Sequence, residues 1–197
     1  MRGVPTLVCL GLLLPGFVSA QEASPWSTPE GVARAFQKAC LLTSGNADQA
    51  VDWALSQGFE PVDALRGNMD GLLSGQPGCV LAAPGTEGHV LLVATQGRHC
   101  TVWADNLQGP ALRSAVAEVM GMQAAKGARV SQQVDRSIER AGAWRHQTQW
   151  RYRDVGKTQD LGVGAVTTLS GAPGTQALHL EPVPTQPALA PDGLLTR

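Results

Sequence analysis

The chain has 197 residues, of which 43% are hydrophobic and 16% are charged, and its formal net charge is −1. This length is enough for a real hydrophobic core in one domain. The slightly acidic balance makes nucleic acid a poor partner, and no apolar stretch after the first twenty residues approaches the length that crosses a membrane.

Residues 1–20 have the pattern of a cleaved secretory signal. Arg2 supplies an early positive charge, and the apolar run TLVCLGLLLPGFV that follows is too short to span a membrane. A buried helix would be interrupted by Pro15 and Gly16. We therefore predict cleavage after Ala20 and a periplasmic or secreted location. Twelve of the fifteen basic residues are arginine, a bias that suggests a GC-rich bacterial genome and favours the periplasm.

Two short antiparallel helices are predicted next. The segment STPEGVARAFQKACLL begins with the N-cap candidates Ser27 and Thr28 and places Cys40 on its apolar, inward face. The segment GNADQAVDWALSQGF begins with Asn46 as its cap and ends at Gly58. A connector over residues 61–78 follows, with a helical turn near residues 69–73.

The middle of the chain predicts a meander and a helix. Strands are expected at residues 79–83, 89–95 and 99–104, because apolar runs there are separated by PGTEG and QG. A helix is expected from Pro110 to Gly127, since its apolar residues recur at helical spacing.

The last part of the chain predicts two hairpins. Val130, Val134 and Ile138 recur every four residues, which suits a helix or a strand, but HQTQWRYR alternates strictly and favours a hairpin that turns at residues 140–143. DLGVGAVTTL and QALHLEPV, joined by SGAPGT, form the second hairpin. Residues 21–183 are thus expected to form a single domain, and the Pro-rich residues 184–197 a flexible tail.

The predicted order ααβββαββββ defines an α+β fold, an antiparallel sheet packed against two or three helices. Neither a βαβ alternation nor a P-loop is present in the sequence. The helix bearing Cys40, followed by WALSQGFEP, CTVWA and QWRYR, resembles small uncharacterised secreted and periplasmic proteins of proteobacteria. Because that group has no assigned function, the resemblance implies no functional residues.

Three cysteines remain once Cys9 leaves with the signal. In an oxidising compartment at least two of them are expected to pair. Cys40 faces inward from its helix, and Cys100 shares strand parity with Val102, so we predict a Cys40–Cys100 disulfide. Cys79 is then the candidate free thiol, and pairings that include Cys79 stay open.

The alternative function is a periplasmic Cys/His hydrolase or thiol oxidoreductase that uses Cys79. His89 could reach a thiol from the neighbouring strand, whereas His99 and Cys100 are adjacent on one strand and point to opposite faces. No cysteine precedes a helix, where its thiol pKa would be lowered. CxxC, HxxxH, HExxH and GxSxG motifs are absent from the sequence, so we expect no metal, cofactor or serine nucleophile.

The positive charge of the chain is concentrated in its later part. Residues 21–125 carry five bases and ten acids, whereas residues 126–157 carry eight bases and three acids. The candidate binding residues are Arg136, Trp144, Arg145, Arg151 and Arg153, because arginine pairs bidentately with carboxylates and phosphates. The same residues also suit the solvated side of a half-covered sheet.

We expect a non-catalytic accessory or binding protein of the cell envelope that recognises a protein partner or an anionic ligand. The expectation depends on the arginine-rich strand and on the lack of a catalytic motif. A purely structural role, with the Pro-rich tail as a tether, is a further alternative.

Overall fold

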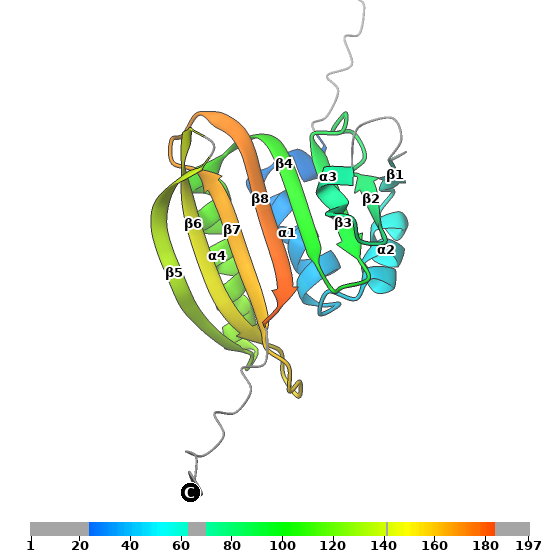
Figure 1. The fold of residues 1–197 in the computed structure, drawn as a ribbon, viewed down its shortest axis with the longest axis vertical. Helices are drawn as coiled ribbons and strands as arrows, with labels where there is room; N and C mark the ends of the chain where they lie inside the picture. Colours follow the sequence, from blue (N-terminus) through cyan, green and yellow to red (C-terminus); the bar gives the residue numbers. More distant parts are fainter. Residues whose placement is uncertain (1–23, 63–69, 141, 184–197) are drawn as a thin grey trace, which may run out of the picture.

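In the computed structural model, residues 24–62, 70–140 and 142–183 are described, and they form one antiparallel sheet with helices (Figure 1). The α+β class and the approximate element order are therefore confirmed. The helical segments are η1 (Pro25–Ser27), α1 (Pro29–Phe36), η2 (Gln37–Leu41), α2 (Ala47–Ser56), α3 (Asp70–Leu73) and α4 (Gly109–Ala125). The predicted signal and the predicted tail lie outside the described residues.

All eight strands belong to one sheet, with the order β1-β2-β3-β4-β8-β7-β6-β5. The strands are β1 (Glu60–Pro61), β2 (Gly78–Ala82), β3 (Val90–Thr95), β4 (Cys100–Gln108), β5 (Arg129–Arg140), β6 (Ala143–Arg153), β7 (Leu161–Thr168) and β8 (Pro173–Pro182). Each neighbouring pair is antiparallel.

The helices begin where side chains satisfy their first backbone N–H groups. The Thr28 hydroxyl accepts a hydrogen bond of 3.0 Å from the Gly31 N–H, and the Asn46 carboxamide accepts one of 3.0 Å from the Gln49 N–H. The first helix is not α-helical throughout, because its last turn widens into the π-helical segment η2. Cys40 lies in this segment and is fully buried.

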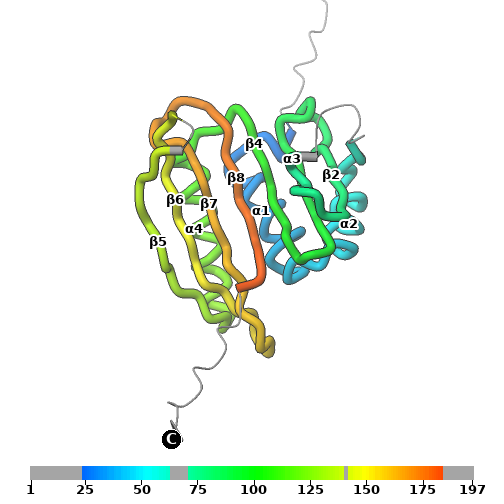
Figure 2. The backbone as a smooth tube through the Cα atoms, in the orientation of Figure 1, coloured from blue at the N-terminus to red at the C-terminus, as the bar shows by residue number. Residues whose placement is uncertain are grey.

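The sheet is made of two meanders joined at their last strands. Helices α1, η2 and α2 precede β1 to β4, and α4 precedes β5 to β8. Strands β4 and β8 then pair, with Cys100 opposite Leu180 and Val102 opposite Leu178. Figures 1 and 2 show α1 and α4 side by side behind the sheet, and these two helices contact each other.

The hydrophobic core lies between the sheet and the helices α1, η2, α2 and α4. Val102, Leu178 and Leu180 of the two joined strands are fully buried in it, as is Phe36 of α1. Cys40 and Cys100 are bonded, with 5.4 Å between their Cα atoms. The predicted disulfide is therefore confirmed, and it ties η2 to the centre of the sheet.

Helix α3 differs from the other helices because it lies on the opposite face of the sheet (Figure 1). Val80 and Val93 are cross-strand partners on that face, yet both are buried, and α3 contacts their strands β2 and β3. The predicted helical turn thus covers one end of this face, and no other helix of the described residues lies on it. We call the rest of this face, over β4, β8, β7, β6 and β5, the open face.

Two differences from the predicted strands follow from pairing. Strand β4 runs to Gln108 rather than ending at residue 104, since β8 supplies hydrogen-bonding partners past a bulge between Ala104 and Leu107. The two-residue strand β1 was not predicted, and its Pro61 pairs with Leu81 at the sheet edge, where proline is tolerated.

We predict that removing the Cys40–Cys100 bridge lowers the free energy of unfolding by about 4 kcal/mol, because the bridge restricts the unfolded chain over a separation of 60 residues. Urea unfolding of the oxidised protein, the reduced protein and the C40A/C100A variant measures this. The C79A variant is the control and should unfold like the parent. Equal stability of oxidised and reduced protein would contradict the prediction.

Candidate functional site on the open face

The register of the strands arranges the open-face side chains in rows that cross the sheet. Trp103 lies between Leu91 and Ala177, and Ala177 pairs in turn with Val166. A second row is formed in the same way by the residues Val93, Thr101, His179 and Gly164. The first row is apolar and the second is mixed, so the floor of the open face has an apolar strip beside polar groups.

A cavity of about 660 Å³ lies over these rows. Leu72, Leu73 and Gln76, from α3 and the turn after it, line one side, and Arg145 of β6 lines the opposite side. Its lining also includes Val93, Trp103, Val166, Ala177, His179 and Glu181. The cavity therefore spans five strands, from β3 to β6, and combines apolar groups with one arginine, two histidines and one glutamate.

His179 lies directly over a glycine of the neighbouring strand. A Cβ atom on Gly164 would be 2.1 Å from Nε2 of His179, closer than any side chain allows. Glycine is therefore needed at this point, since it lets the imidazole lie across β7. His179 also lines a second hollow of about 250 Å³ towards Gln149 and Arg151, so the open face is hollowed on both sides of its ring.

An ion pair occupies one end of the cavity. Nδ1 of His99 is 3.9 Å from a carboxylate oxygen of Glu181, and both side chains are about half exposed. Such an exposed pair contributes little to stability. The contact compensates the negative charge of Glu181 only when His99 is protonated.

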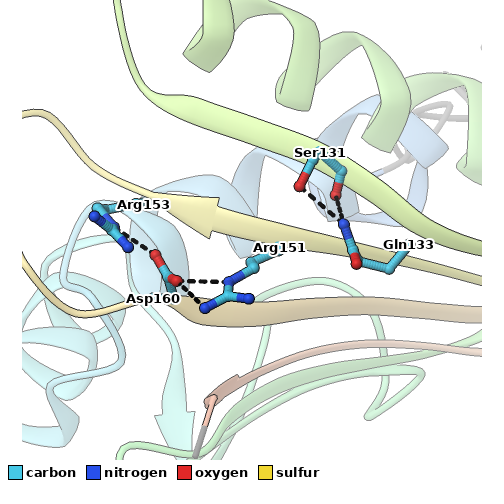
Figure 3. Close-up of polar contacts among 5 residues, drawn as sticks. All are labelled: Ser131, Gln133, Arg151, Arg153 and Asp160. Atoms are coloured by element: carbon cyan, nitrogen blue, oxygen red, sulfur yellow. Dashed lines mark hydrogen bonds and ion pairs between the residues drawn. The ribbon is translucent and has the colours of Figure 1, made fainter. Parts of the chain in front are cut away.

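Asp160 engages two of the predicted binding arginines. Its carboxylate accepts hydrogen bonds from the guanidinium groups of both Arg151 and Arg153, as Figure 3 shows. The hydrogen bond from Arg153, together with the bond and charge of Arg151, lowers the pKa of Asp160 to about 2. Only 11% of the Asp160 side chain is exposed. Part of the positive charge expected on this strand is thus neutralised locally.

The other predicted binding residues lie apart from this cluster. Arg136 donates to the Oε1 atom of Gln147 at 3.4 Å on the exposed strand β5. Arg145 lines the cavity, and its side chain makes no hydrogen bond or ion pair with another described residue. Trp144 is 60% exposed, and its strand parity with His146 directs it to the face opposite Arg145. The structure therefore brings only Arg145 of the predicted set into the cavity.

The edge strand β5 is irregular near the second hollow. A bulge lies between Gln132 and Val134, and the Gln133 amide donates to the carbonyl and hydroxyl oxygens of Ser131 (Figure 3). Bulges of this kind hinder further strand pairing at a sheet edge.

Sequence reasoning missed His99, Trp103, His179 and Glu181 as components of one site. A signal for part of it was present, because Cys100 and Val102 were assigned to the core face and their alternate neighbours His99, Thr101 and Trp103 must then share the other face. No local sequence pattern indicates that β8 pairs with β4. The alternation of apolar and polar residues therefore could not predict that His179 and Glu181 belong to this site.

Cys79 is exposed and takes no part in the disulfide. It pairs with Ala94, whereas His89 precedes the other end of β3, five residues or about 17 Å away along the strand. His99 lies on the open face, opposite the face to which the parity of Cys79 points. Neither histidine is therefore placed to act as a base for this thiol.

Comparison of the chain with protein-family models, with curated proteins and with solved structures finds no match. Within the described ranges, no cluster of three His, Cys, Asp or Glu side chains could hold a metal ion. In the same part of the chain, no helix is both long enough and apolar enough to cross a membrane.

We predict that D160N weakens the fold at pH 7 and removes part of its pH dependence. The folded-state pKa of Asp160 is about 2, below its ordinary value of 3.8, so its stabilising contribution is present above pH 4 and is lost as the pH falls towards 2. Urea midpoints at pH 7 and pH 3 should differ more in the parent than in D160N. D52N, at an exposed position of α2, is the control; an unchanged pH dependence in D160N would refute the prediction.

We also predict that Cys79 reacts as an ordinary exposed thiol. Iodoacetamide should modify it in the native, unreduced protein no faster than it modifies a short peptide with the same flanking sequence, since no base lies beside it. Mass mapping identifies the site, and C79S is the blank. Much faster modification of Cys79 would instead support the thiol enzyme.

Proposed function

We propose that the protein is a non-catalytic binding protein that recognises an anionic ligand in the cavity of the open face. The observation that carries this proposal is the position of Arg145, which lines a cavity of about 660 Å³ without a described partner. A volume of this size lies within the range of roughly 300–1,000 Å³ that is usual for small-molecule sites. An arginine lining a concave site is well suited to bind a carboxylate or phosphate.

The architecture supports binding rather than a purely structural role. A sheet face without covering helices would otherwise be expected to carry solvated polar residues, as β5 and β6 do near Arg136 and Gln147. Around Trp103 the face instead has apolar neighbours, walled on one side by Leu72 and Leu73. Exposed apolar surface inside a concave site is typical of ligand pockets.

An extracytoplasmic location is part of this proposal. It is supported by the signal-like pattern of residues 1–20, with cleavage proposed after Ala20, and by the Cys40–Cys100 disulfide, which is compatible with an oxidising compartment. Trp144 on the opposite face is where a protein partner would be sought, but it lies outside the cavity.

The thiol enzyme has less support than the binding protein. It requires a base near Cys79, and the histidines nearest in sequence, His89 and His99, are separated from it by distance along β3 or by the sheet itself. We therefore assign no catalytic role to Cys79.

We predict that A177F fills the cavity and abolishes ligand binding without unfolding the protein, because Ala177 lies on the cavity floor between Trp103 and Val166. Thermal unfolding with a panel of small acids, alcohols, sugars and amines measures this, since a ligand of the native state raises the melting temperature. Q147F, on the same face outside the cavity, is the matched control. Ligands that stabilise the parent and Q147F but not A177F support the proposal; a panel without such ligands contradicts it.

A further inference from the structure

We infer that the cavity binds a small carboxylic acid with an apolar body, its carboxylate on Arg145 and its body over Trp103, Ala177 and Val166. This inference rests on the proposed function and names the ligand class of the same site. It requires an available arginine inside the cavity, an apolar surface close to that arginine, and too little positive charge in the cavity for a doubly charged anion.

Among the described residues that line the cavity, Arg145 is the one arginine. Arg151 and Arg153 share the carboxylate of Asp160, and Arg136 is bonded to Gln147 outside the cavity. Arg145 is half-buried and lines the cavity without a partner among the described residues. A ligand carboxylate would form a bidentate, charge-assisted pair with this guanidinium, and the pair would replace the guanidinium's hydrogen bonds to water.

The apolar strip lies one row away from Arg145, whose own cross-strand partner on β7 is Thr168. Val166, Ala177 and Trp103 are consecutive cross-strand neighbours, and Leu72 lies with them in the lining on the α3 side. Adjacent strands are about 4.8 Å apart, so the floor from β6 to β3 extends for about 19 Å. An acyl chain or small hydrocarbon frame attached to a carboxylate can therefore bury its apolar part along this strip.

Other ligand classes fit the charges less well. A phosphate monoester, which carries nearly two negative charges at pH 7.5, would leave charge unpaired at Arg145 and would be repelled by Glu181 at the cavity end more strongly than a carboxylate. An amine would be repelled by Arg145. A neutral alcohol could occupy the apolar strip, but it would leave the guanidinium without an anion, so it should bind more weakly than the acid of the same length.

The test compares octanoate, octanol and octylamine by isothermal titration calorimetry at pH 7.5, below their micellar concentrations. These probes share one chain length and differ in the charge of the head group. We expect the parent protein to bind octanoate at least tenfold more tightly than octanol and to show no measurable binding of octylamine. Comparable affinities for octanoate and octanol would overturn the inference without any variant.

Two arginine variants locate the carboxylate. R145Q should weaken octanoate binding at least tenfold and leave octanol binding unchanged, whereas R136Q, an arginine on the same face but outside the cavity, should bind both probes like the parent. Unchanged octanoate affinity in R145Q would also overturn the inference. If octanoate fails but another ligand of the thermal panel is lost in A177F, the ligand class is wrong and the proposed function stands; if no panel ligand depends on Ala177, the proposed function fails.

Discussion

The pairing of β4 with β8 is the constraint on which the rest of the structure depends. It joins two meanders that are each built from local hairpins, and it does so between segments separated by most of the second half of the chain. On the core face of this strand pair, the disulfide of Cys100 with Cys40 ties the sheet to η2. On the open face of the same pair, the cavity floor is formed by Trp103 of β4 and by Ala177 and His179 of β8. The core and the candidate site are therefore two faces of the same strand pair.

The uneven distribution of helices explains why the site lies where it does. Helices α1 and α4 pack against each other and against one face of the sheet, which buries the apolar alternation of β4, β7 and β8. Among the helices that the structure describes, only the four-residue helix α3 reaches the other face, and it covers Val80 and Val93 rather than the whole surface. Helix α3 therefore stands above the strands beside it that no described helix covers. Its side, with Leu72 and Leu73, forms one wall of the cavity.

The electrostatics of the open face depend on a loop residue more than on the strand that carries the arginines. The alternation of HQTQWRYR placed Arg145, Arg151 and Arg153 on one face, and the register agrees with that alternation. Asp160, immediately before β7, then compensates two of them, and their hydrogen bonds and positive charges keep its carboxylate ionised. Among the described residues that line the cavity, Arg145 is then the one arginine, and it lies near the apolar strip. That pattern favours a different ligand from the polyanion that a row of free arginines would attract.

The sequence by itself determined the α+β class, the hairpins and the boundaries of most helices, because capping residues, alternation and helical spacing act over a few neighbouring residues. It favoured the Cys40–Cys100 pair but left pairings with Cys79 open. It also indicated that Arg145 faces away from the core. Only the tertiary structure decided that β8 lies beside β4, that α3 covers the second face, and that Asp160 reaches Arg151 and Arg153. Those contacts join segments distant in the chain, and their choice depends on the packing of whole strands and helices, which no local pattern records.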